Sequence, residues 1–211
     1  MAEDAIAIAG LVDWLSRFGE LVTANRGYLT ELDSAIGDAD HGANMARGMD
    51  AVLASFEVAT PATADTLFTG VGMTLVGSVG GASGPLYGTF FLRLGSAVGP
   101  VTQLDSAALS AALRAGLGGV QLRGKAEPGD KTMLDALVPA IDAFDAVIAG
   151  GADLAAATAA ASQAADDGRD ATAPLVAKKG RASYLGERSA GHLDPGATSM
   201  AYLFAALAAA T

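Results

Sequence analysis

Three aspartates lie close together in residues 32–44, which read LDSAIGDADHGAN. Asp33, Asp38 and Asp40 fall within eight positions, and carboxylates this close repel one another unless a cation offsets their charge. A single helix would not present all three on one face, because offsets of five and two residues rotate by roughly 140° and 200°. The chain must therefore turn, and Gly37 allows it to do so. The full segment favours a site for a hard cation over an acidic, solvated turn with a helix cap.

Four connections between predicted helices combine glycine with side chains that could bind a ligand. They are residues 37–44, 80–84, 123–131 and 178–196. Each precedes a predicted helix, and a helix N-terminus presents unpaired N–H groups that can receive a phosphate. In an up-and-down bundle alternate loops lie at the same end, so we expect several of these N-termini to converge.

Other motifs that would bind nucleotide or metal fail on context. Residues 119–126, GVQLRGKA, match a P-loop except at Ala126, which stands where Ser or Thr would hold magnesium, and they follow a predicted helix instead of a strand. The spacing after Asp38 does not fit an EF-hand. The only histidines, His41 and His192, both lie in the ligand-rich loops, and we interpret them as groups for nucleotide contact or polar positioning and not as nucleophiles.

The periodicity of apolar residues predicts an all-α fold of about eight helices. Val and Ile never alternate with polar residues over the length of a strand, so no strand is expected. Asp194 and Pro195 have the pattern of a helix cap followed by proline in the first turn. Eight helical segments are expected at residues 4–23, 43–56, 63–79, 86–98, 106–120, 132–148, 153–166 and 197–210, with a further short helix at 28–36 that leads into the acidic loop.

The composition narrows the class of protein. The 211 residues fit one domain, 1–211, and contain no cysteine, which excludes disulfides and thiolate metal sites. A net charge of −10 argues against nucleic acid as a partner. The N-terminus lacks a basic signal-peptide region, and no apolar run reaches the ~18 residues of a membrane span, so we expect a cytoplasmic protein. Four of the 13 basic residues lie within residues 178–188. This cluster is typical either of an anion site or of a helix C-terminus.

Four strings resemble the nucleotide-binding L subunit of the phosphotransferase-system, phosphoenolpyruvate-dependent type of dihydroxyacetone kinase. They are LDSAIGDADHGANMARG, GMTLVGSVGGASGPLYGTFF, RGKAEPGDKTM and KKGRASYLGERSAGHLDPGATS. The resemblance extends from the first third of the chain nearly to its end and says least over residues 152–165. It implies an eight-helix, up-and-down antiparallel barrel, with a nucleotide and two Mg²⁺ ions held by loops at one rim.

The resemblance also implies roles for individual residues. Asp33, Asp38 and Asp40 would be the magnesium ligands, in agreement with the reading from their spacing. No catalytic residue is expected with certainty in this chain. The residues expected around ADP or ATP are His41, Gly42 and Asn44 in DADHGAN, Ala82 and Ser83 at a phosphate-binding helix start, Gly124 and Met133 beside the base, and Arg181, Asp194 and Pro195 in the rest of the pocket.

Members of the family that this chain resembles keep ADP bound as a cofactor. A phosphohistidine-carrying M subunit recharges ADP to ATP, and the phosphoryl group passes to dihydroxyacetone on a separate K subunit. Three alternatives remain open at this point. The chain could serve a related sugar or keto-alcohol kinase that uses free ATP, or contact a transcription regulator in a nucleotide-dependent way, or carry a lipid or other small molecule inside an apolar barrel.

Overall fold

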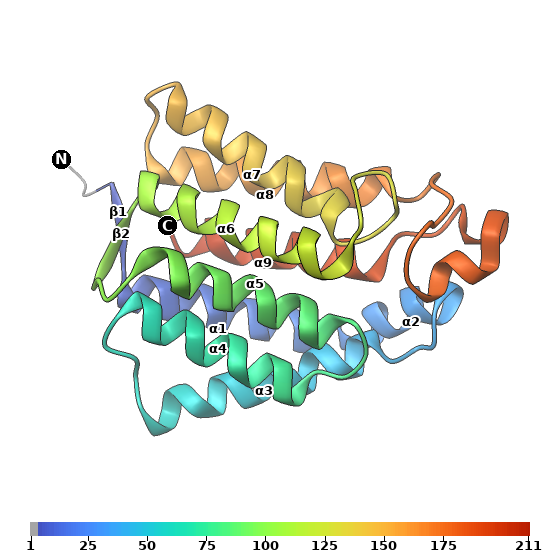
Figure 1. The fold of residues 1–211 in the computed structure, drawn as a ribbon, viewed down its shortest axis with the longest axis horizontal. Coiled ribbons are helices and arrows are strands. Elements are labelled where there is room, and N and C mark those ends of the chain that lie inside the picture. The colour runs from blue at the N-terminus through green and yellow to red at the C-terminus, as the bar shows by residue number, and fades with distance from the viewer. Residues whose placement is uncertain (1–3) are drawn as a thin grey trace.

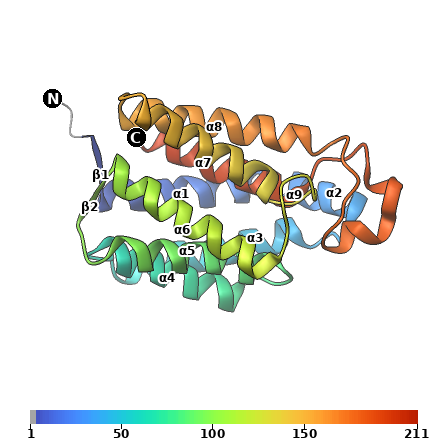
Figure 2. The same ribbon diagram turned by 45° about the horizontal axis from the view of Figure 1, so that its top comes forward.

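Residues 4–211 are described here from a computed structural model (Figure 1). The helices lie side by side along one long axis, and most neighbours in sequence run antiparallel (Figures 1 and 2). The all-α prediction is confirmed. The described helices are α1 (Ile8–Ala24), α2 (Arg26–Ile36), α3 (His41–Val58), α4 (Ala64–Ser78), α5 (Ser83–Val98), α6 (Ser106–Gly124), α7 (Leu134–Ala149), α8 (Leu154–Ala171), the 3₁₀ helix η1 (Arg181–Ser189) and α9 (Pro195–Ala209).

A small sheet contradicts the expectation that the chain has no strand. β1 (Ala5–Ala7) pairs antiparallel with β2 (Gln103–Asp105), with Ala5 opposite Asp105. The helix expected from residue 4 therefore begins only at Ile8. Three-residue strands are too short to show an alternating pattern, and their pairing joins segments almost 100 residues apart.

The apolar faces predicted from the periodicity form one core. In α1 the side chains of Leu11, Leu15, Phe18 and Val22 are all fully buried, as their spacing predicts. Trp14 is also buried there, and its indole N–H donates to the Leu203 carbonyl of α9 at 2.8 Å. This bond joins the first and last long helices of the bundle. No described helix is both long enough and apolar enough to cross a membrane.

Helices α4 and α5 approach each other closely through glycines. A Cβ at Gly72 of α4 would lie 2.8 Å from the Gly88 carbonyl oxygen of α5 and 2.7 Å from Leu92 Cγ. A Cβ at Gly88 would in turn lie 2.9 Å from the Gly72 carbonyl oxygen. Side chains at these positions would force the two helices apart. This tight pair supports the start of α5, which contributes to the site described next.

Candidate nucleotide and metal site

A cavity of about 650 Å³ lies at the end of the bundle where α3, α5, α7 and α9 begin. Each of the four glycine-bearing loops singled out from the sequence contributes residues to its wall. The expected convergence of helix N-termini is therefore confirmed. It follows from the antiparallel order, in which every second connection returns to the same end (Figure 1).

The three aspartates meet at one side of this cavity. One carboxylate oxygen from each of Asp33, Asp38 and Asp40 lies within 4.8 Å of the other two. Asp33 is buried at the end of α2, and its Oδ2 accepts hydrogen bonds from the backbone N–H groups of Asp40 at 2.8 Å and His41 at 3.0 Å. Asp33 thus holds the turn in place and caps the start of α3. An all-oxygen set of three carboxylates suits Mg²⁺.

Gly37 has a different role from the one inferred from the sequence. Its φ is −141°, outside the left-handed region, so the turn does not depend on the freedom of glycine to adopt a positive φ. A Cβ at this position would instead collide with the Asp33 carboxylate. The left-handed residue of the turn is Ala39, with φ 62°, between the other two aspartates. Strained backbone of this kind is typical of ligand-binding turns.

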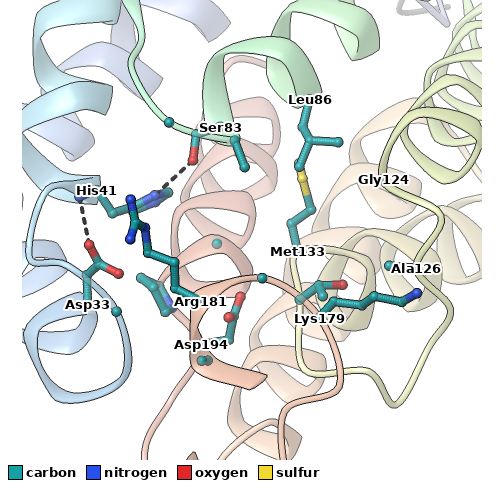
Figure 3. Close-up of a pocket in the computed structure, with 18 of the residues that line it drawn as sticks. Asp33, His41, Ser83, Leu86, Gly124, Ala126, Met133, Lys179, Arg181 and Asp194 are labelled. Atoms are coloured by element: carbon teal, nitrogen blue, oxygen red, sulfur yellow. Dashed lines mark hydrogen bonds between the residues drawn. The ribbon is translucent and has the colours of Figure 1, made fainter. Parts of the chain in front are cut away.

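His41 lies in a buried polar network that joins three helices. Its Nδ1 is 3.1 Å from Ser83 Oγ of α5, and its Nε2 is 2.9 Å from Ser199 Oγ of α9. The Tyr87 hydroxyl is 2.8 Å from the same Ser199 oxygen. Burial lowers the pKa of His41 to about 4, although the charges of Asp33 and Asp40 raise it. The imidazole is therefore neutral at pH 7, and both its nitrogens are engaged in positioning. Figure 3 shows the contact between the ring and Ser83.

Ala82 and Ser83 line the cavity where α5 begins. Gly124 lines it from the end of α6, and Met133 lines it from the position just before α7. Leu86 of α5 points toward Met133, so that an apolar surface faces the cavity beside Gly124 (Figure 3). A Cβ at Gly124 would lie 3.3 Å from Leu86 Cδ2, which leaves little room for a side chain there. An apolar slot of this kind suits a flat base, while the helix start suits a phosphate.

Basic groups approach from the loop that follows α8. Arg181 Nε lies 2.7 Å from Asp38 Oδ2, and Lys179 lines the cavity beside it. The local cluster of basic residues in the sequence therefore supplies cations to the cavity. His192 is exposed and does not line the cavity, in contrast to His41.

Asp194 and Pro195 line the cavity at the start of α9. The Asp194 carboxylate accepts the backbone N–H of Ala197 at 2.7 Å, which confirms the predicted cap, and Pro195 is the first helical residue. Burial raises the pKa of Asp194 to about 7, and this exceeds the opposing effects of the Ala197 hydrogen bond and the Lys131 charge.

Gly42 and Asn44 do not line the cavity. Gly42 packs against α2, where a Cβ would collide with the Arg26 carbonyl oxygen. Asn44 Oδ1 accepts from Arg47 Nη2 at 2.6 Å, and the Asn44 side chain lies against Gly80. Both residues support the walls of the cavity, and their contact with a nucleotide stays a prediction.

Several cavity residues were not among the individual site residues predicted from the sequence, although Arg123 and Lys131 bound one of the four loops singled out there. Tyr87 and Lys131 line the cavity, as does Arg123 at the end of α6. Ser199 does not line the cavity but is hydrogen-bonded to the lining residues His41 and Tyr87. Tyr87 lies four residues after Ser83, an offset that places both residues on the same face of α5. Lys131 follows Asp130 in the GDKTM string, but nothing in its spacing indicates that it is buried.

A family model and two curated relatives match most of this chain and agree on its family. The model of the DAK2 domain family matches residues 35–209. The ADP-binding subunit DhaL of the PEP-dependent dihydroxyacetone kinase of Escherichia coli is 45% identical over 200 residues, which cover 95% of each chain. The corresponding subunit of dihydroxyacetone kinase 1 from Listeria innocua is 47% identical over 194 residues, which cover 92% of each chain.

Solved structures show the same fold. The dihydroxyacetone kinase of C. freundii in its native form matches with a TM-score of 0.70 and 30% identity over 97% of this chain. Its complex with AMP-PNP and Mg²⁺ matches with a TM-score of 0.71 and 28% identity over 94% of this chain. These matches cover 34% and 33% of the kinase chain, so the present chain corresponds to about a third of it. The chain therefore belongs to the DAK2-domain family, in which it groups with the ADP-binding DhaL subunits of PEP-dependent dihydroxyacetone kinases.

Proposed function

We propose that this chain is the ADP-binding subunit of a phosphoenolpyruvate-dependent dihydroxyacetone kinase and keeps ADP as a cofactor with two Mg²⁺ ions. In this proposal a phosphohistidine-carrying partner converts the bound ADP to ATP. The phosphoryl group then passes to dihydroxyacetone held by a second partner subunit. The names of the relatives, which describe ADP-binding subunits of such kinases, support the nucleotide and the reaction class.

The observation that carries the proposal is the meeting of three carboxylates, helix N-termini and basic side chains in one cavity. Asp33, Asp38 and Asp40 would hold Mg²⁺, and the start of α5 at Ala82 and Ser83 would receive phosphate oxygens. The base would lie against Met133 and Gly124. The AMP-PNP and Mg²⁺ named for the C. freundii complex are the same classes of ligand.

The residues of this chain would act by positioning and by charge. Bound Mg²⁺ supplies neutralisation of phosphate charge, and phosphoryl transfer needs little covalent help beyond that. The neutral His41 ring holds the Ser83 hydroxyl at the phosphate end of the cavity. Arg181 adds a cation beside Asp38. Since both His41 nitrogens are engaged, the phosphoryl group would move directly between nucleotide and partner, without a covalent intermediate on this histidine.

Mass spectrometry and absorbance of the nucleotide released by denaturing the purified protein test this proposal. We expect nearly one ADP per chain from the wild type and none from Asp38→Ala, because removal of one ligand weakens Mg²⁺ and nucleotide together. Asp142→Ala is the matched control, since Asp142 pairs with Arg114 on the surface and is no part of the cavity. A wild type that binds neither nucleotide nor Mg²⁺ would refute the proposal.

The same measurement separates the proposal from a kinase that exchanges free ATP. That second candidate is a kinase for a related sugar, and it is supported by the 36% identity to an L-erythrulose 1-kinase of Mycolicibacterium smegmatis, although the match covers only 34% of that longer protein. Wild-type protein that is purified empty, but binds and releases ATP readily, would support the free-ATP reading.

A further inference from the structure

The segment between α8 and α9 forms a loop, residues 172–194, whose two ends are bonded together. The Gly191 N–H donates to the Ala173 carbonyl at 2.7 Å, and the Asp194 N–H donates to Thr172 Oγ1 at 3.0 Å. We call these paired ends the neck of the loop. The far part of the loop contains η1, which begins with Arg181. The neck therefore determines where Arg181 and Asp194 lie.

A lysine from a different part of the chain fills the neck. Lys131 is only 1% exposed, and its ammonium group lies among backbone carbonyl oxygens from both ends of the loop. Its Nζ is 2.9 Å from Thr172 O and 3.0 Å from Leu175 O on the incoming end, and 2.6 Å from His192 O on the outgoing end. A fourth oxygen, Ala173 O, is 3.4 Å away. An ammonium group has three N–H donors, which match the three shorter contacts.

The backbone that presents Lys131 is itself held firmly. Lys131 has φ 63°, a left-handed conformation, and the preceding Asp130 carbonyl accepts the Lys178 N–H at 3.0 Å. The Asp135 carboxylate accepts the N–H groups of Gly129 and Thr132, on either side of Lys131. Burial lowers the pKa of Lys131, while the charges of Asp194 and Asp135 raise it. Two residues further along, Met133 lines the cavity.

Lys131 thus joins the 123–131 loop to both ends of the 172–194 loop, in addition to the backbone bond between Lys178 and Asp130. Arg181 has no comparable anchor of its own, since its side chain is 68% exposed and its ion pair with Asp38 is an exposed contact of low intrinsic strength. Because the contacts of Arg181 do not fix its position, that position depends on the orientation of the 172–194 loop. The carbonyl cage around the ammonium supplies that orientation through charge-assisted hydrogen bonds.

We propose that Lys131 is a positioning residue for the nucleotide–metal site: its ammonium closes the neck of the 172–194 loop and thereby fixes Arg181 beside Asp38. This inference rests on the proposed function, because it assigns Lys131 a role in binding Mg²⁺–ADP. The competing role for a buried lysine is to stabilise the fold alone.

Isothermal titration of Mg²⁺–ADP into nucleotide-free protein tests the proposal on Lys131→Met, which keeps the unbranched stem as far as Cε and removes the charged Nζ. We expect the affinity to fall about tenfold or more, as for loss of hydrogen bonds from a charged group, with helical circular dichroism unchanged. Lys125→Met is the matched control. Lys125 also has a left-handed backbone, with φ 50°, but it is exposed and does not line the cavity.

A double-mutant cycle provides the readout that a purely structural role would not change. If Lys131 acts through Arg181, the loss caused by Lys131→Met must shrink markedly when Arg181→Met is already present. An equal loss in both backgrounds overturns the proposal, as does an unchanged affinity or a Lys131→Met chain that loses its helical signal. Wild-type protein that fails to bind Mg²⁺–ADP would reject the proposed function itself, so the two failures are distinguishable.

A chemical rescue adds a second, independent variant. The chain contains no cysteine, so Lys131→Cys can be alkylated at this one position in denaturant and then refolded. Aminoethylation restores a cation of nearly lysine length, whereas carbamidomethylation adds a neutral group of similar size. We expect most of the Mg²⁺–ADP affinity to return with the aminoethyl group and not with the carbamidomethyl group. Equal affinities of the two products would overturn the proposal.

Discussion

Asp194→Asn is expected to change how the stability of the nucleotide-free protein depends on pH. Burial raises the folded-state pKa of Asp194 to about 7 from the ordinary value of 3.8. Below 3.8 the carboxyl is protonated whether the chain is folded or not, so its contribution to stability is fully present there. As pH rises from 3.8 toward 7, only the unfolded chain ionises freely, and this contribution is lost.

The size of the effect follows from the shift. A difference of about three pKa units corresponds to at most roughly 4 kcal/mol of unfolding free energy, lost between the two pKa values at up to about 1.4 kcal/mol per pH unit. Asparagine does not ionise, yet its side-chain oxygen can still accept the Ala197 N–H at the start of α9. The variant should therefore lose less stability than the wild type as pH rises from 4 to 8.

Urea denaturation monitored by circular dichroism, repeated across this pH range without nucleotide or Mg²⁺, measures the effect. Asp153→Asn is the matched control because Asp153 caps α8 in the same way, by accepting the Ala156 N–H at 2.9 Å, but at an exposed position. The difference between the two variants isolates the effect of burial. Parallel stability profiles for wild type and Asp194→Asn from pH 4 to 8 would refute the reasoning.

Three further stability predictions follow from the packing and the buried hydrogen bonds. Gly72→Ala should destabilise the protein by about 1–3 kcal/mol, because the new Cβ would lie 2.8 Å from the Gly88 carbonyl oxygen of α5. Gly70→Ala on the same helix meets nothing within 4 Å and should stabilise it by about 0.5–1 kcal/mol through helix propensity. Thermal melts of the two variants check both signs, and a Gly72→Ala protein as stable as Gly70→Ala would contradict the close approach. Ser199→Ala should destabilise the fold by about 1–3 kcal/mol, because His41 Nε2 and the Tyr87 hydroxyl would lose their shared partner. Denaturant titration measures this loss, and an unchanged midpoint would show that the network is not needed.

Most of the helices could be predicted because their causes are local. Apolar residues at helical spacing indicate α1 and its buried face, and the Asp194–Pro195 pair marks the start of α9. The strands β1 and β2 could not be predicted, since each is only three residues long and exists through pairing with the other. The 3₁₀ helix η1 was likewise expected to be part of a polar loop.

In the candidate site, too, some features depend on local sequence and others only on the fold. Asp33, Asp38 and Asp40 are close in sequence, so their types and spacing alone indicate a cation site, and the fold brings one oxygen of each within 4.8 Å of the others. The role of Gly37 could be seen only in the structure, because the group that excludes a side chain at this position is the Asp33 carboxylate.

The sequence by itself determined the all-α class, the start of α9 and the residue types that could bind Mg²⁺ and phosphate, because these depend on neighbours a few positions away. Only the tertiary structure decided which of these groups share a cavity. The Tyr87–Ser199 bond joins residues 112 positions apart, and Lys131 bonds to carbonyls 41 to 61 positions away. Buried polar contacts of this kind leave no local pattern, because each donor finds its acceptor only when the antiparallel helices bring distant loops to the same end of the bundle.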